Sequence, residues 1–428
     1  MKRISSLLLL VILAACTQAQ SIDQIINPAE TERIERILSS DEMMGRRPFT
    51  AGIDKAAAFI ADEFKKAGLQ PLTGQTSFLQ TFTMVRPAFV SAKGNFDGTE
   101  LDGKNIMVFT TKPSVTIDNK SGYEIVKITA TDTFGAKAPM YIRGSKNVLV
   151  LVDSVHERQF KNLPRFKRES FPVERIVAFV LTNKTPSNFS IQAEHSIKEM
   201  TLSNVVGVLP GKSKKEEYVL FSGHYDHLGI GRPTKEMDSI YNGANDDASG
   251  ITAVILLANY FKKLANNERT LVFAAFTAEE SGGFGSQYFS KQFDPVKVMA
   301  MFNIEMIGTE SKWGTNSAFI TGYERTDMGK ILEKNLEGSQ FKFYPDPYPD
   351  QQLFYRSDNA TLARVGVPAH TISTSKMDSE KFYHTADDEI ETLDMKNMAE
   401  IIKAIAISST SIVAGKDTPS RVDTKQLR

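Results

Sequence analysis

The sequence predicts an α/β protein, namely a three-layer αβα fold whose central sheet is mixed and mainly parallel, with an inserted strand-rich subdomain. From Leu202 onward, short apolar runs alternate with helical segments, which is typical of a parallel sheet between two helix layers. Residues 270–276 are almost entirely apolar, as expected of a central strand that is covered on both faces. Between Thr73 and Met200 this alternation is absent and strand-like runs recur between polar residues, which indicates the insertion.

The main domain begins with two predicted helices. Residues 29–38 have helical apolar spacing, and residues 52–68 form an amphipathic pattern with Gly68 as a C-cap. A third helix is predicted at 251–264. The predicted strands of the main domain share a short apolar composition, and they are 205–209, 218–221, 270–276, 298–304 and 367–372.

Five segments follow from these patterns along the chain of 428 residues. They are a signal peptide with lipobox (1–20), the N-terminal part of the main domain (21–75), the inserted strand-rich subdomain (76–200), the rest of the main domain (201–415) and a C-terminal tail (416–428). Within the insert, His156 and His195 stand alone, and we expect each to be a surface or hydrogen-bonded histidine.

The composition is that of an ordinary globular protein. Hydrophobic residues make up 41% and charged residues 24%, and 51 basic side chains balance 51 acidic ones. A net charge of zero without a long basic run gives no support to a nucleic-acid partner. Oligomeric state is left open by the sequence.

The N-terminus has the pattern of an export signal. Lys2 and Arg3 precede a short apolar run that ends in LAAC, and Cys16 is the single cysteine of the chain. The run is too short to span a bilayer stably. Small residues before a cysteine resemble a bacterial lipobox, so we expect Cys16 to be lipidated and the protein to be anchored in the cell envelope by this lipid alone. The alternative is a plain signal peptide cleaved near Ala19.

A set of acidic and imidazole side chains lies at or just after the ends of predicted strands, or before a helix. Because the carboxyl ends of parallel strands meet at one edge of the sheet, these side chains are expected to converge there. The set consists of His224, Asp226, Asp246, Glu279, Glu280, Glu305 and His384.

This mixture of ligands suits zinc. Zinc binds imidazole nitrogen and carboxylate oxygen, and a hydrolytic site keeps one position open for water. Two ions ~3.5–4 Å apart need a bridging carboxylate and terminal ligands of their own. We therefore expect two zinc ions per chain, bridged by Asp246, with His224 and Glu305 on one ion and Glu280 and His384 on the other.

Two acidic residues are left without a metal. Asp226 stands two residues from His224 and is expected to hold its imidazole ring. Glu279 is a free carboxylate beside the metals, which is the expected position of a general base.

The sequence resembles the zinc aminopeptidase family that includes bacterial leucyl-type aminopeptidases, glutamate carboxypeptidase II and glutaminyl cyclases. The resemblance covers residues 41–69 and 202–412, and it implies a zinc-exopeptidase fold with the residue roles given above. Asp246 matches the bridging aspartate because it stands three residues before Ser249. The motifs that carry the resemblance are GHYDHLG, GANDDASG, TAEESGGFGS, NIEMIG, YRSDNATLARVGVPA and YHTADDEIETL.

Two positions depart from the family pattern. Glu305 stands where the family usually has aspartate, which keeps a carboxylate but adds one methylene. Asn359 stands where many relatives have histidine, and we assign it no metal role.

Several other polar residues near the motifs are expected to be structural. His227 is interpreted as a supporting residue and His370 as a hydrogen-bonded core histidine. Asp247 is expected to accept from the backbone at the following helix start, and Asp387 and Asp388 to cap the helix after His384.

The predicted function is that of an exported zinc metallopeptidase acting on peptides. The resemblance favours an exopeptidase, specifically an aminopeptidase, with Glu279 taking a proton from zinc-activated water. One alternative is a glutaminyl-peptide cyclotransferase on the same fold, which uses one zinc. The other is a non-catalytic binding module like the transferrin receptor, which the full set of ligands argues against.

Overall fold

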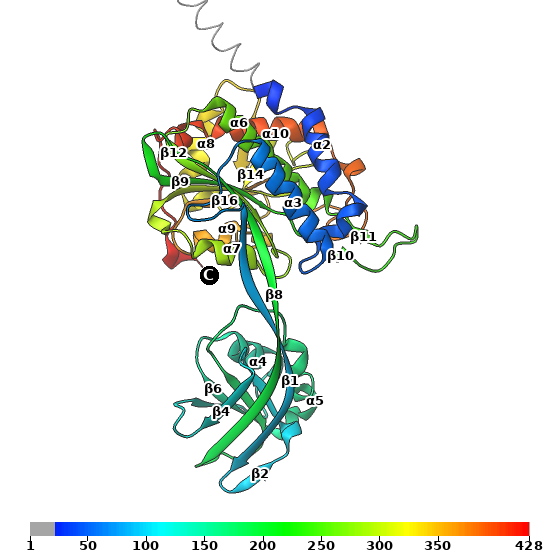
Figure 1. Ribbon diagram of the computed structural model, residues 1–428, viewed down its shortest axis with the longest axis vertical. Coiled ribbons are helices and arrows are strands. Elements are labelled where there is room, and N and C mark those ends of the chain that lie inside the picture. The colour runs from blue at the N-terminus through cyan, green and yellow to red at the C-terminus, as the bar shows by residue number, and fades with distance from the viewer. Residues whose placement is uncertain (1–21, 428) are drawn as a thin grey trace, which may run out of the picture. The chain divides into compact units, whose positions relative to one another are not determined.

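The computed structural model describes residues 22–427, and the chain divides into two compact units (Figure 1). Unit 1 combines the described residues up to Thr81 with those from Leu202 onward, and unit 2 is Phe82–Thr201. Unit 1 is a mixed α/β domain and unit 2 is inserted within it. The predicted fold class is therefore confirmed.

The sheet of unit 1 is mixed, and its centre is parallel. Strand β9 (Lys214–His224) pairs in parallel with β12 (Arg269–Phe276) on one side and with β13 (Val298–Ile304) on the other. Beyond β13 lie β16 (Ala369–Ser373), β14 (Ser317–Ile320) and β15 (Lys342–Pro345), of which β14 runs antiparallel to β16. On the other side, β12 pairs antiparallel with β8 (Phe189–Leu209), and β1 (Leu79–Phe96) follows.

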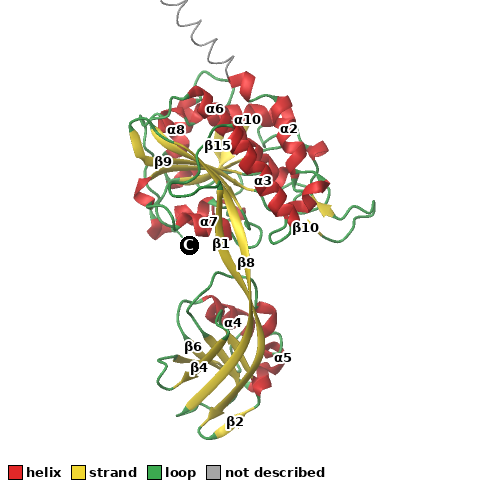
Figure 2. Ribbon diagram, viewed as in Figure 1, coloured by secondary structure: helices red, strands yellow, loops and turns green. Residues whose placement is uncertain are grey.

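Helices cover both faces of this sheet (Figure 2). Phe221 of β9 faces the larger hydrophobic core, where its ring stacks on Phe261, Phe273 and Phe302 at centroid distances of 5.3, 5.6 and 4.9 Å. The neighbouring Leu220 faces the smaller core on the opposite side. The alternation of side chains along buried strands thus produces the three layers.

The helices of the larger core are α2 (Pro28–Leu38), α3 (Ala51–Lys66), α6 (Ser249–Leu264), α8 (Met328–Asn335), α10 (Met395–Ser408) and α11 (Thr410–Val413). The smaller core contains side chains of α7 (Phe284–Ser290) and α9 (Asn359–Ala363). A separate two-stranded ribbon is formed by β10 (Gly229–Ile230) and β11 (Ile240–Tyr241).

The predicted elements of the main domain are present, with some differences in length. The two N-terminal helices differ from the prediction by one or two residues at their ends. Strands β8 and β9 are much longer than predicted, and His224 is the last residue of β9 instead of following it.

Unit 2 contains a four-stranded sheet in the order β3-β7-β6-β5, in which β7, β6 and β5 are parallel. These strands are β3 (Ile106–Phe109), β5 (Glu124–Ile128), β6 (Val148–Val152) and β7 (Val177–Leu181), accompanied by α4 (Phe134–Arg143) and α5 (Glu157–Phe160). The short strands β2 (Thr99–Leu101) and β4 (Ser114–Asp118) pair with β1 and β8. His156 and His195 each contact a backbone carbonyl oxygen at 2.9 Å, as predicted for isolated histidines.

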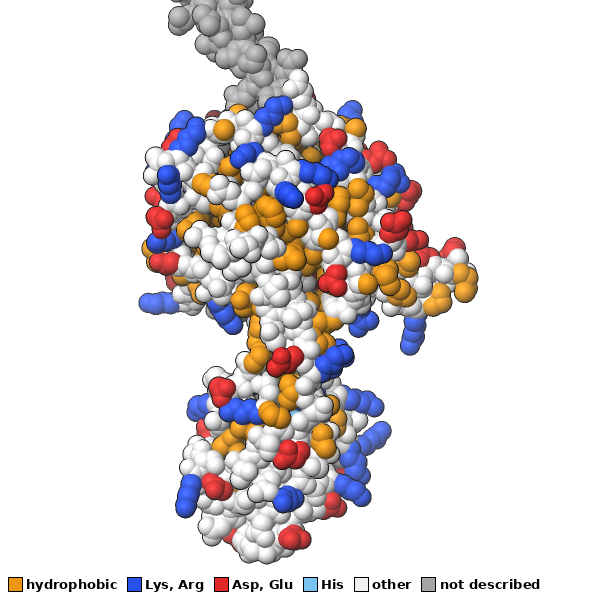
Figure 3. Space-filling model, in the orientation of Figure 1, with side chains coloured by type: hydrophobic (Ala, Val, Ile, Leu, Met, Phe, Trp, Pro, Cys, Tyr) orange, Lys and Arg blue, Asp and Glu red, His pale blue; other side chains and the backbone are white. Residues whose placement is uncertain are grey.

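The surface carries both signs of charge. On the face shown in Figure 3, basic and acidic side chains are interspersed, in keeping with the zero net charge. None of the helices in residues 22–427 has both the length and the apolar character needed to cross a membrane. The predicted lipidation site, Cys16, lies outside the described residues.

The buried side chain of Arg46 connects three separate segments of unit 1. Arg46 has no exposed surface, and its guanidinium donates to the carbonyl oxygens of Leu38, Tyr225, Asn242 and Gly243. It therefore joins the end of α2, the loop after β9 and the turn before α6. Burial lowers the pKa of Arg46, while nearby carboxylates oppose this shift.

We expect Arg46→Met to destabilise unit 1 by about 3 kcal/mol, because each buried carbonyl left without a donor costs ~1–3 kcal/mol. Urea unfolding followed by the fluorescence of Trp313, the single tryptophan and a residue of unit 1, measures this. Arg47→Met is the matched control, since Arg47 is exposed and its loss should change stability by less than about 0.5 kcal/mol. Equal effects of the two substitutions would contradict the role given to Arg46.

Candidate metal centre

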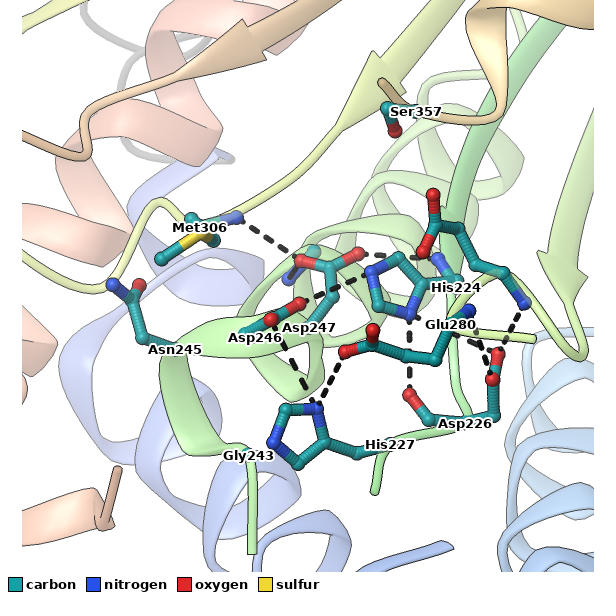
Figure 4. Close-up of polar contacts among 12 residues, drawn as sticks. His224, Asp226, His227, Gly243, Asn245, Asp246, Asp247, Glu280, Met306 and Ser357 are labelled. Atoms are coloured by element: carbon teal, nitrogen blue, oxygen red, sulfur yellow. Dashed lines mark hydrogen bonds and ion pairs between the residues drawn. The ribbon is translucent and has the colours of Figure 1, made fainter. Parts of the chain in front are cut away.

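Four elements deliver polar side chains to one edge of the sheet (Figure 4). His224 ends β9, Glu280 follows β12 and Glu305 follows β13. Because these strands are parallel neighbours, their carboxyl ends lie at the same edge. Asp246 comes from the turn Ala244–Ala248 that leads into α6.

The first donor group consists of His224, Asp246 and Glu305, whose ligand atoms lie within 4.8 Å of one another. Nε2 of His224 is 3.1 Å from Oδ1 of Asp246. The extra methylene of Glu305, compared with aspartate, therefore does not keep its carboxylate out of the group.

The second donor group consists of Asp246, Glu280 and His384. Nε2 of His384 lies 3.2 Å from Oδ2 of Asp246 and 2.9 Å from Oε1 of Glu280. His384 comes from a loop after the last strand and its side chain is one-third exposed. Since Asp246 offers Oδ1 to the first group and Oδ2 to the second, its carboxylate lies in the bridging position.

These contacts are arranged for a cation and not for hydrogen bonding. Oε1 of Glu280, Oε2 of Glu305 and Nε2 of His384 are all buried and form no hydrogen bond among the described residues, although Glu280 and His384 are 2.9 Å apart. Their lone pairs are thus free for a shared ion. Nitrogen and carboxylate oxygen donors in groups of this size fit zinc.

The pKa values of these residues are shifted because several carboxylates are buried close together. Burial raises the pKa of Glu305 to about 7. Burial would lower the pKa of His384, but contacts with Asp246 and Glu280 raise it to about 10. Burial also opposes ionisation of Asp246, yet His224 and His384 hold its pKa well below the usual range. Positive charge beside these carboxylates therefore stabilises their ionised forms.

Glu279 is a member of neither donor group, although it interacts with His224 and Glu305. Burial and the neighbouring carboxylates of Glu305 and Asp358 raise its pKa well above the usual value, while His224 opposes this shift. A carboxylate with a raised pKa is a stronger proton acceptor, which suits a general base.

Asp226 supports the site differently from the prediction. Nδ1 of His224 lies 3.1 Å from the backbone carbonyl oxygen of Asp226 and 3.8 Å from its carboxylate, so the carbonyl is the nearer partner of the ring. The carboxylate instead accepts from the backbone N–H groups of Glu279 and Glu280, at 2.9 and 3.3 Å.

Two other aspartates hold the backbone around Asp246. Asp247 accepts from the N–H groups of His224, Gly250 and Met306, which includes the predicted contact at the start of α6. Asp388 accepts from the N–H groups of Asn245 and Asp246, at 2.8 and 3.0 Å.

The prediction that Asp387 and Asp388 cap the following helix is wrong. Asp394 caps α10 by accepting from the N–H groups of Lys396 and Asn397. The segment after His384 contains several acidic residues, and the sequence alone does not show which of them accepts from the first N–H groups of α10.

The remaining histidine and asparagine predictions have mixed outcomes. His370 is buried and hydrogen-bonded through both ring nitrogens, to Thr321 and Thr326, as predicted. Asn359 bonds to backbone carbonyls and to Thr371, away from the donor groups.

His227, interpreted from sequence as a supporting residue, offers a donor atom within 4.8 Å of those of Asp246 and Glu280. Its spacing of three residues from His224 was the available signal.

Comparison with known proteins identifies the region that carries the site. Residues 204–408 match peptidase family M28, and this region includes both donor groups and Glu279. A probable leucine aminopeptidase of Trichophyton verrucosum is 31% identical over 209 residues, which are 47% of this chain and 54% of that protein. Leucine aminopeptidase 1 of Ajellomyces dermatitidis is 28% identical over 273 residues, or 60% of this chain and 67% of that protein. The chain thus spans about half the length of the first of these curated relatives.

Solved structures share the fold. An aminopeptidase from Aneurinibacillus sp. strain AM-1 superposes with a TM-score of 0.53 at 14% identity, covering 92% of this chain and 95% of that one. A zinc aminopeptidase from Bacillus subtilis gives a TM-score of 0.53 at 15% identity, with coverage of 93% and 98%. At these identities the likeness establishes the fold.

We expect Asp388→Ala to weaken zinc binding by about 10–100-fold, the usual effect of removing a residue that supports a ligand, because the turn bearing Asp246 loses two acceptors. Zinc titration calorimetry on metal-free protein measures this. The matched control is Asp387→Ala, since Asp387 is exposed and adjacent. Indistinguishable zinc affinities for the two variants would show that the turn does not depend on Asp388.

Proposed function

Because residues 204–408 match peptidase family M28, we propose that the protein is a zinc-dependent aminopeptidase, which removes residues from the amino end of peptides. The observation that carries the proposal is the pair of donor groups that share Asp246, with the buried carboxylate of Glu279 interacting with His224 and Glu305 of the first group. The aminopeptidase names of the relatives support the choice of peptide end.

In this proposal each donor group would hold one zinc ion, and Asp246, which belongs to both groups, would contribute a carboxylate oxygen to each. Zinc supplies Lewis acidity, which lowers the pKa of a water molecule and polarises a peptide carbonyl. Glu279 accepts the proton of the attacking water and then transfers it to the leaving amine. The carboxylate of Asp226 holds the backbone of Glu279, so the base keeps its position during this transfer.

A cavity beside Glu305 is a candidate site for the substrate side chain. Phe319, Leu353 and Met377 contribute apolar walls to this cavity. Burying an apolar side chain there is favourable by about 25 cal/mol per Å² removed from water. We therefore propose a preference for an apolar residue at the amino end of the peptide.

The location of the enzyme follows from its N-terminal segment. We propose export to the cell envelope with lipidation at Cys16, based on the LAAC sequence that follows the apolar run. Metabolic labelling with a fatty-acid analogue checks this, and Cys16→Ser should remove the label.

The reaction class is tested with a substrate panel on zinc-loaded protein. We expect hydrolysis of leucyl and other apolar aminoacyl reporters, and zinc analysis should give two ions per chain. Hydrolysis of only carboxyl-terminal reporters would contradict the aminopeptidase proposal. Cyclisation of a peptide with N-terminal glutamine, together with one zinc per chain, would point to the cyclotransferase instead.

We expect Glu279→Gln to lower kcat by about 10²–10⁴-fold, the usual contribution of a general base, with both zinc ions retained. Steady-state kinetics on an aminoacyl reporter, with metal analysis of the same sample, separates loss of the base from loss of metal. Glu236→Gln, at an exposed position, controls for the change of charge. A near wild-type rate in Glu279→Gln would show that another residue is the base.

A further inference from the structure

His227 lies against the second donor group, although its role was not apparent from the sequence. Its side chain is fully buried, and Nδ1 is 3.1 Å from Oε1 of Glu280 and 3.9 Å from Oδ2 of Asp246. Its ring packs edge-on against that of His384, with centroids 5.7 Å apart. His227 therefore reaches the same carboxylate oxygens as His384. Figure 4 shows the contacts of His227 with Asp246 and Glu280.

Neither ring nitrogen of His227 has a hydrogen-bond partner among residues 22–427. The 3.1 Å contact with Glu280 lacks the alignment of a hydrogen bond, since both atoms count as unpaired. Leaving a buried polar group unpaired costs ~1–3 kcal/mol. The buried His370 shows the ordinary alternative, because both of its ring nitrogens are bonded. The unpaired nitrogens of His227 thus call for a partner that residues 22–427 do not supply.

We propose that Nδ1 of His227 is a ligand of the metal ion held by the second donor group, in addition to His384. The inference rests on the two-metal site proposed above. With Asp246, Glu280 and His384, it raises the number of protein donors around this ion to four, the number found in closed zinc sites. The first donor group keeps three donors and hence an open position for water.

This arrangement makes the two metal positions chemically different. The open position lies with Glu305, which also lines the cavity proposed for the substrate side chain. The four-donor position has two nitrogen donors, His227 and His384, whereas the first donor group has one, His224. His224 and His227 are three residues apart, so the end of β9 and the residues directly after it would supply one histidine to each ion.

The two histidines of the four-donor position differ in how deeply they are buried. The side chain of His384 is one-third exposed, whereas that of His227 is inaccessible to solvent. We expect His384→Ala to retain the second metal equivalent with lowered affinity, because three donors remain. His227→Ala should weaken that equivalent by more than about 100-fold, beyond the usual effect of losing a supporting residue. The double variant should bind one ion per chain.

The experiment is metal counting by mass spectrometry after dialysis, together with the visible spectrum of the protein loaded with Co²⁺. Removal of a ligand changes the cobalt absorption bands, and this readout needs no peptidase activity. If the wild-type protein fails the aminopeptidase assay, but the cobalt spectrum of His227→Ala differs from that of the wild type, the proposed function is contradicted and this inference is not.

His227→Gln separates a ligand from a supporting residue. The amide of glutamine can still donate to Glu280, so a wild-type cobalt spectrum and affinity in this variant would overturn the proposal. So would two tightly held ions and an unchanged spectrum in His227→Ala. His370→Asn is the control for removing a buried histidine, and we expect it to lower the unfolding temperature while both ions and the spectrum stay as in the wild type.

Discussion

The structure depends on the compensation of negative charge that is buried at one edge of the sheet. Carboxylates this close in a low-dielectric environment cannot all ionise without nearby positive charge or hydrogen-bond donors. Asp247 and Asp388 are compensated by backbone N–H groups. The carboxylates of Asp246 and Glu280 instead lie against histidine rings, and Glu305 belongs to the same donor group as His224 and Asp246. Two kinds of carboxylate therefore lie at this edge. Asp247 and Asp388 bind backbone N–H groups, whereas Asp246, Glu280 and Glu305 are arranged to bind cations.

The scaffold is precise because rigid elements meet there. Parallel pairing of β9 with β12 and β13 fixes the spacing of His224, Glu280 and Glu305. The turn with Asp246 pairs with no strand, but Asp247 joins it to the end of β9. Asp388 also holds it, as does Arg46 through Gly243. Segments that are far apart in sequence thus contribute as much to the geometry as the strands do.

Much of this could be predicted from sequence, because the relevant signals are local. Apolar runs followed at once by His224, Glu280 or Glu305 are enough to expect convergence at the sheet edge. The roles of Asp388 and Arg46 could not be predicted, since their partners are backbone groups that come together only in the folded chain. The position of His227 beside Asp246 and Glu280 could not be predicted for a related reason, because residue spacing does not reveal which direction an imidazole faces in an irregular segment. The lengths of β8 and β9 were underestimated, since their polar portions lack the apolar runs by which strands were recognised.

The contact of Asp226 with the peptide backbone of Glu279 and Glu280 has a wider consequence. Glu279, the proposed general base, and Glu280, a proposed zinc ligand, occupy consecutive positions on one chain segment, and the carboxylate of Asp226 accepts from both of their backbone N–H groups. In the proposed mechanism, a shift of this segment would therefore move the base and the ligand together. Such coupling would let the surroundings of the site vary while the base keeps its position relative to the ion.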